Sequence, residues 1–185
     1  MFIFFQLLLG WLYGHFVEYF MHRWVFHNRK LFKTAFNYHY SQHHARSRRG
    51  VMLDVTTLRK PHVKDFESMA LLGGVLLHSP FVFIFPYFFA MVCYSAVAYY
   101  LIHRRSHQDF EWARKYIPWH YDHHMGPNSN KNWGVRLDIF DKLLGTREVY
   151  KGTPVEIIKY RNYEFRGYYA LRPHRDKRKR YKEID

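Results

Sequence analysis

The amino-acid sequence predicts an all-α fold, an integral-membrane helical bundle of about three membrane passes with a cytosolic helical cap. Two stretches, residues 1–21 and 68–102, contain no Lys or Arg and supply the apolar material for the passes. The 29 Lys and Arg residues lie almost entirely between or after these stretches, as in the cytosolic loops of membrane proteins. Many of the 16 Tyr and 5 Trp lie in or beside the apolar stretches, where the bilayer interface favours their rings. A mean hydropathy of −0.42 conceals this segregation.

The two apolar stretches differ in how they are expected to cross the bilayer. Residues 1–21 are long enough for one membrane helix, and they lack the charged start and cleavage site of a signal peptide. Residues 68–102 would reach about 50 Å as one straight helix, well beyond a hydrocarbon core of about 30 Å. Because Pro80 and Pro86 interrupt this stretch, we expect a membrane hairpin of two short passes with its turn near 78–86. A pair of re-entrant helices is the alternative.

The remaining segments are polar and complete a single domain over residues 1–185. Residues 22–67 and 103–150 are rich in histidine, and residues 151–185 form a basic tail. The two histidine-rich segments can meet only if the hairpin returns to the side of the membrane from which it entered. The excess of positive charge places both of them, together with the C-terminus, in the cytosol. The tail either binds anionic lipid headgroups or is a solvated end.

Composition disfavours several classes of function. The single cysteine, Cys93, cannot form an internal disulfide or a cysteine-based metal site. No Gly-rich dinucleotide fingerprint is present, so the chain shows no redox module of its own. The net charge of +14 and pI near 9.9 are typical of nucleic-acid-binding proteins. We nevertheless expect no nucleic-acid partner, because the positive charge flanks the apolar stretches.

Histidine is the most informative residue type in the chain. There are fourteen histidines, and ten of them fall into four short groups, two on each side of the expected hairpin. The other four are isolated and are read as structural. The ten candidate metal ligands are His22 and His27; His39, His43 and His44; His103 and His107; and His120, His123 and His124.

The spacing within each group has a geometric meaning. Residues three and four apart share one face of a helix, so His103 and His107, His39 and His43, and the last triplet can each aim imidazoles at one point. His22 and His27 are five apart, which requires either a π-bulge or a helix end between them. Imidazole suits iron, copper, zinc and nickel. Ten imidazoles are too many for one ion, so the pattern predicts a site for two.

These motifs resemble those of the fatty acid hydroxylase superfamily, which includes sterol desaturases, sterol methyl oxidases, fatty acid hydroxylases and carotenoid hydroxylases. Its pattern of a HisX3–4His box, a HisX2–3HisHis box, a later HisX3His and a final HisX2HisHis occurs here in order. The segment from Asn132 to Thr146, Asn-Trp-Gly…Phe-Asp-Lys-Leu-Leu-Gly-Thr, is similar to the family segment that follows the last box. The resemblance covers roughly residues 11–150.

The resemblance implies a non-haem di-iron enzyme that uses O2 as cosubstrate and hydroxylates a fatty acyl or related lipid. It implies two iron ions on the ten histidines, with zinc as a substitute, and an external electron donor such as cytochrome b5 or a ferredoxin. The expected location is the endoplasmic reticulum or a bacterial inner membrane. Sterol or lipid desaturation and carotenoid hydroxylation are alternatives within the superfamily, and the oligomeric state stays open.

A membrane metal transport or storage protein is the alternative from another class. Transport ligands are expected within the membrane passes, often with carboxylates. The ten histidines lie outside the long apolar stretches, and residues 68–102 contain one histidine, His78, and no acidic residue. This distribution favours the enzyme.

Side chains that support the metal ligands are a further expectation. Metal-bound imidazoles usually donate their other N–H to a carboxylate or a carbonyl. Glu18 precedes His22 by four residues on the same helical face, and several polar residues lie near the last box. Asp138 and Asp141 could equally cap a helix or pair with Arg136. The candidates are Glu18, Asp122, Asn132, Asp138 and Asp141.

Overall fold

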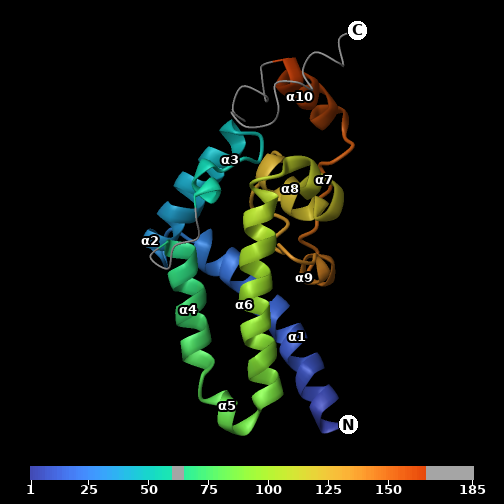
Figure 1. Ribbon diagram of the computed structural model, residues 1–185. Coiled ribbons are helices and arrows are strands. Elements are labelled where there is room, and N and C mark those ends of the chain that lie inside the picture. Colours follow the sequence, from blue (N-terminus) through green and yellow to red (C-terminus); the bar gives the residue numbers. More distant parts are fainter. Residues whose placement is uncertain (60–64, 166–185) are drawn as a thin grey trace, which may run out of the picture. The chain divides into compact units, whose positions relative to one another are not determined.

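The computed structural model describes residues 1–59 and 65–165, and within these ranges it contains helices and loops but no strand (Figure 1). The all-α prediction is confirmed. The chain divides into two compact units, Met1–Lys151 and Gly152–Asp185. All ten candidate histidines lie in the first unit. The described part of the second unit contains helix α10 (Pro154–Phe165), and the basic tail beyond residue 165 lies outside the described residues.

The N-terminal half of the first unit alternates between α-helical and π-helical segments. Helix α1 (Phe2–Phe20) continues into the π-helix η1 (Met21–Phe26), which ends at His27. This confirms the irregularity expected between His22 and His27. Helix α2 (Lys33–Phe36) likewise continues into the π-helix η2 (Asn37–His44) and then α3 (Ala45–Arg49). The second π-helix was not foreseen.

The second apolar stretch is broken where the prolines predict. Helix α4 (Phe66–His78) is followed by the single turn α5 (Phe81–Ile84) and by the long helix α6 (Pro86–Ser106), with Pro86 at its first position. In Figure 1, α4 and α6 run side by side and α5 joins their lower ends. The backbone therefore forms a helical hairpin with its turn near 78–86, and its place in a membrane stays a prediction.

Helix α1 packs against α6 at close range. Gly10 and Gly14, one turn apart on α1, face α6: a Cβ added to Gly10 would lie 2.7 Å from Met91 Cβ, and one added to Gly14 would lie 2.7 Å from Ser95 Cβ. Small residues four apart allow two helix backbones to approach closely. This contact positions two of the candidate histidines relative to each other, because His22 follows the end of α1 and His103 lies near the end of α6.

The apolar helices expose many large hydrophobic side chains. Among the described residues, however, no helix is both long enough and apolar enough to cross a membrane. The three expected membrane passes are therefore not confirmed. Strongly exposed apolar side chains on α1, α4, α5 and α6 include Phe4, Leu77, Phe83, Ile84 and Val97.

Short helices complete the part of the first unit that surrounds the histidines. The 3-10 helix η3 (Val55–Leu58) starts at Asp54, whose side chain accepts a hydrogen bond from Thr56 N. Helix α7 (Phe110–Tyr116) starts at Asp109, which caps Trp112 N in the same way. Helices α8 (Pro118–Met125) and α9 (Ile139–Leu143) follow. Residues 120–125 of α8 are all buried, so the last histidine box lies in the protein interior.

Candidate metal centre

The fold brings the ten candidate histidines together. Nine are buried and His27 is half-buried. Nine of the ten form two neighbouring groups, and within each group the possible ligand atoms lie within 4.8 Å of one another. His120 belongs to neither group, but its Nε2 lies 3.2 Å from His107 Nε2. The first group is His22, His27, His39, His44 and His123, and the second group is His43, His103, His107 and His124.

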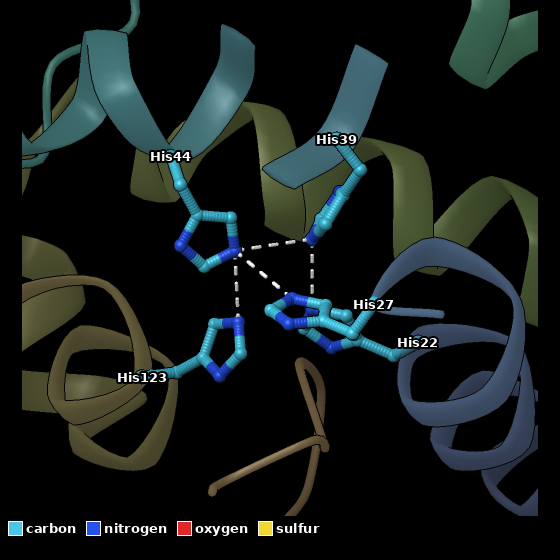
Figure 2. Close-up of side chains that lie close together, drawn as sticks. All are labelled: His22, His27, His39, His44 and His123. Carbon is cyan, nitrogen blue, oxygen red and sulfur yellow. Dashed lines mark hydrogen bonds between the residues drawn. The ribbon is translucent and has the colours of Figure 1, made fainter. Parts of the chain in front are cut away.

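The first group converges on one point from four parts of the chain (Figure 2). The Nε2 atoms form a connected set of short distances: 2.9 Å from His22 to His39, 3.2 Å from His39 to His44, 3.1 Å from His44 to His27 and 3.1 Å from His44 to His123. His22 lies in η1, His27 follows it, His39 and His44 lie in η2, and His123 lies in α8.

The second group is built from η2, from α6 and the residue that follows it, His107, and from α8. Within the described residues, the buried Nε2 atoms of His43 and His103 and both ring nitrogens of His124 have no hydrogen-bond partner. The ring centroids of His43 and His107 lie 4.3 Å apart, and those of His107 and His124 lie 4.5 Å apart. Buried nitrogens without partners are uncommon in proteins, and here they point to a ligand.

The adjacent histidine pairs divide between the two groups. His44 and His123 belong to the first group, and their neighbours His43 and His124 belong to the second. Consecutive residues of a helix point about 100° apart, so a His-His pair can serve two neighbouring ions but not one. His39 and His43 were expected to aim at one point, as were the three histidines of the last box, and both expectations are wrong. In the wider π-helix η2, His39 and His44, five residues apart, share a side instead.

Backbone carbonyls fix the tautomer of three imidazoles. The Nδ1 of His22 donates to the carbonyl of Trp133 at 2.6 Å, that of His123 donates to Lys131 at 2.7 Å, and that of His107 donates to Met52 at 2.7 Å. A carbonyl only accepts hydrogen bonds, so each Nδ1 carries the proton and each Nε2 presents a lone pair. This is the arrangement that metal-bound histidines require.

Carboxylates hold two imidazoles of the second group. His43 Nδ1 donates to Asp54 at 2.8 Å, and His103 Nδ1 donates to Glu67. Burial alone would raise the pKa of Asp54, but His43 and Arg46 together hold it well below its usual range, so Asp54 is ionised. The sequence analysis missed both acids. One sequence feature could have indicated Glu67: it is the last acidic residue before the apolar stretch 68–102.

Burial keeps the imidazoles of the first group neutral. It lowers the pKa of His22 to about 3 and that of His27 to about 2, and it also holds the pKa values of His39, His44 and His123 well below the usual range. Neutral imidazoles whose lone pairs converge repel one another unless a cation lies between them. An ion about 2.0–2.1 Å from each nitrogen would place ligands at right angles about 2.9 Å apart. The observed 2.9–3.2 Å separations match this spacing.

Three residues that support the centre have left-handed backbone conformations. Asn132 has φ of 61° and lies between Lys131 and Trp133, whose carbonyls accept from His123 and His22. Val51 and Met52 have φ of 51° and 72°, and the Met52 carbonyl accepts from His107. Such conformations cost about 1–3 kcal/mol each and cluster at functional sites. Here they aim carbonyl groups at imidazoles.

The five polar residues predicted to support the ligands contact neighbouring loops rather than the imidazoles themselves. Among the described residues, none of them forms a hydrogen bond to an imidazole; their partners lie mainly in the loop between α8 and α9 or in the segment after α9. Glu18 accepts from Arg136 Nε at 2.6 Å and from Val135 N, and Asp141 accepts from Trp133 N and Gly134 N at 2.8 and 2.7 Å. The Asn132 side chain bonds to Glu148 and Arg147, and both Asp122 and Asp138 pair with Arg147.

A cavity of about 930 Å³ reaches both histidine groups. Its lining includes His39 of the first group and His43 and His103 of the second, together with apolar side chains of α1, α4 and α6. An elongated apolar ligand in this cavity would therefore have one part beside the histidines. The arrangement suits chemistry at two metal ions on a largely hydrocarbon molecule.

Comparison with known proteins identifies one match. A family model described as fatty acid hydroxylase matches residues 7–146, a range that contains all ten histidines and the segment from Asn132 to Thr146. No curated protein and no solved structure matches the chain.

Proposed function

The chain belongs to the fatty acid hydroxylase family, and from this we propose that it is a membrane-bound non-haem di-iron oxygenase that hydroxylates a fatty acyl or related lipid. One observation carries the proposal: two adjacent histidine groups share the His-His pairs and meet a largely apolar cavity. Each turnover would combine the lipid C–H bond, O2, two electrons and two protons to give the lipid alcohol and water.

The residues present fit two resident iron ions. The first group would hold one ion, and the second group together with His120 would hold the other. Imidazole suits iron as well as zinc, so zinc is the expected substitute in a preparation. When bound, the ions supply the activation of O2 and the oxidation of an unactivated C–H bond.

The protein's own groups prepare the site for that chemistry. Asp54, Glu67 and the three carbonyls hold the ring orientations, so that little reorganisation is needed when an ion binds. The cavity between α1, α4 and α6 orients the lipid, and its apolar wall excludes water from the reacting carbon. Desaturation would use the same hydrogen abstraction and differ only in the fate of the substrate radical.

The surroundings of the enzyme are part of the proposal. We propose that the exposed apolar side chains of α1, α4, α5 and α6 lie in lipid, with the histidine groups on the cytosolic side of the endoplasmic reticulum or a bacterial inner membrane. The electrons would come from a separate donor such as cytochrome b5 or a ferredoxin. The net charge of +14 would favour docking of an acidic protein.

Lipid mass spectrometry tests the reaction. Cells supplied with a compatible donor and isotope-labelled O2 would express the native chain, His124→Ala, or His174→Ala, which replaces a histidine outside the four groups. A lipid that gains one labelled oxygen with the native chain and His174→Ala, but not with His124→Ala, supports the hydroxylase. Loss of two hydrogens would identify a desaturase. Identical lipid profiles from a chain that binds two metals, in several hosts, would favour metal handling.

A further inference from the structure

The cavity contains a second polar feature, away from the histidine groups. Tyr13 of α1 and His78, the last residue of α4, both line it, and Tyr13 Oη lies 2.7 Å from His78 Nε2. The other nitrogen of His78, Nδ1, lies 2.7 Å from the carbonyl of Gly74. The Tyr13 ring also packs against Phe88, with centroids 5.3 Å apart. Two polar side chains are thus held in fixed orientation within an otherwise apolar part of the wall.

The hydrogen bonds determine what this pair can offer to a ligand. Because the Gly74 carbonyl only accepts, His78 Nδ1 carries the proton, and in the neutral ring Nε2 is an acceptor. Tyr13 Oη must then donate its single proton to His78 Nε2. What remains available at Tyr13 is the oxygen lone pairs, so the pair accepts a hydrogen bond and has none to donate. The ligand group that fits is a hydrogen-bond donor, and on a largely hydrocarbon ligand the simplest such group is a hydroxyl.

The pair lies far from the histidine groups along α4. Glu67, at the start of that helix, contacts His103, and His78 follows eleven residues later, which corresponds to roughly 17 Å. The cavity wall between them is mainly apolar and includes Leu71 and Val75 of α4 and Val92 and Ala96 of α6. The cavity therefore offers hydrocarbon contacts between two polar ends.

We propose that Tyr13, oriented by His78, binds the hydroxyl group of a long-chain lipid alcohol and so selects which carbon reaches the histidine groups. This inference rests on the proposed function, because it takes the cavity as the substrate site. It adds a requirement that an apolar cavity alone would not impose: the substrate carries a hydroxyl remote from the carbon that is oxidised.

A binding experiment without turnover tests the proposal. The purified full chain, loaded with zinc so that no oxidation occurs, would be titrated in detergent with hexadecanol and with hexadecyl methyl ether, and bound ligand would be counted by radiolabel. The two probes share the hydrocarbon chain, but only the alcohol can donate a hydrogen bond. We expect the native chain to prefer the alcohol by about tenfold, the effect of one hydrogen bond. Equal binding of the two probes would overturn the proposal.

The double variant Tyr13→Phe, His78→Leu provides the test, since it removes the Tyr13 hydroxyl together with the His78 nitrogen that would otherwise become free to accept. It should abolish the preference for the alcohol and leave binding of the ether within about twofold, whereas Tyr94→Phe on an exposed part of α6 should leave both unchanged. A double variant that still prefers the alcohol by about tenfold would contradict the assignment. Retained ether binding shows that the variant is folded. If the alcohol preference is found but no lipid is oxidised in cells, the proposed function fails and the binding site stands.

Discussion

His22 and His123, which lie far apart in the sequence, donate their Nδ1 protons to the two carbonyls on either side of one residue, Asn132. The left-handed φ of 61° at Asn132 turns these carbonyls toward the imidazoles, and its side chain is tied to Glu148. Both histidines belong to the first group. One backbone turn therefore sets the orientation of two of its five possible ligands.

Replacement of Asn132 should weaken metal binding according to backbone preference. Glycine adopts positive φ without strain, whereas valine at such a position is strongly disfavoured. We expect Asn132→Gly to retain more metal than Asn132→Val, with the valine variant losing about 10–100-fold in affinity at the first group, as for other residues that orient ligands. Competition with a metal chelator measures this. Equal affinities for the two variants would contradict a role for the backbone turn.

The Asp54 carboxylate should matter to the second group. Asp54→Asn removes the charge that faces His43 and Arg46, and we expect about 10–100-fold weaker binding of one of the two metals. Asp65→Asn is the matched control, because Asp65 is exposed and has no side-chain cap contact. Chelator competition that gives the same two affinities for Asp54→Asn as for Asp65→Asn would show that Asp54 does not support the site.

The close contact between α1 and α6 predicts sensitivity at Gly14. A side chain there would overlap Ser95, so Gly14→Leu should destabilise the fold by about 1–3 kcal/mol through overpacking and lower the Tm followed by circular dichroism. Gly73→Leu is the control, because a Cβ at Gly73 meets no atom within 4 Å. If the Gly14 variant melts no lower than the Gly73 variant, the helices do not pack as described.

Buried neutral histidines predict a characteristic pH dependence. Burial holds the pKa of His22 at about 3 and that of His27 at about 2, whereas in the unfolded chain both lie near 6.5. Below about pH 6.5 the unfolded state therefore binds more protons, and the metal-free protein loses up to about 1.4 kcal/mol per pH unit for each such histidine. The Tm of chelator-treated protein should fall between about pH 7 and about pH 5. A Tm that rises over this interval would contradict the burial of neutral rings.

Local sequence rules predicted the helical class, the break before α6 and the irregularity after His22. Proline positions and a five-residue histidine spacing are local signals, so no tertiary information was needed. The division of His43 from His44 was not predicted. It depends on the π-helical winding of η2, which puts His39 beside His44 rather than beside His43.

The supporting residues were predicted less well, because their contacts cross the chain. Asp54 lies eleven residues from His43, and Glu67 lies thirty-six residues from His103. No periodicity links such positions. Glu18 was expected to contact His22 on the same helix face, but it accepts hydrogen bonds from Arg136 and Val135 instead. A guanidinium and backbone N–H groups together donate several hydrogen bonds to a buried carboxylate, whereas a neutral imidazole donates one.

The metal content of the purified chain tests the central claim most directly, namely that the histidines form two adjacent metal sites. Inductively coupled plasma mass spectrometry should find about two ions per native chain. Because His43 and His44 belong to different groups, His43→Ala and His44→Ala should each retain about one ion, and the two variants should lose different ones, so that the double variant retains none. A native chain that binds a single ion when metal is in excess would contradict the two-site account.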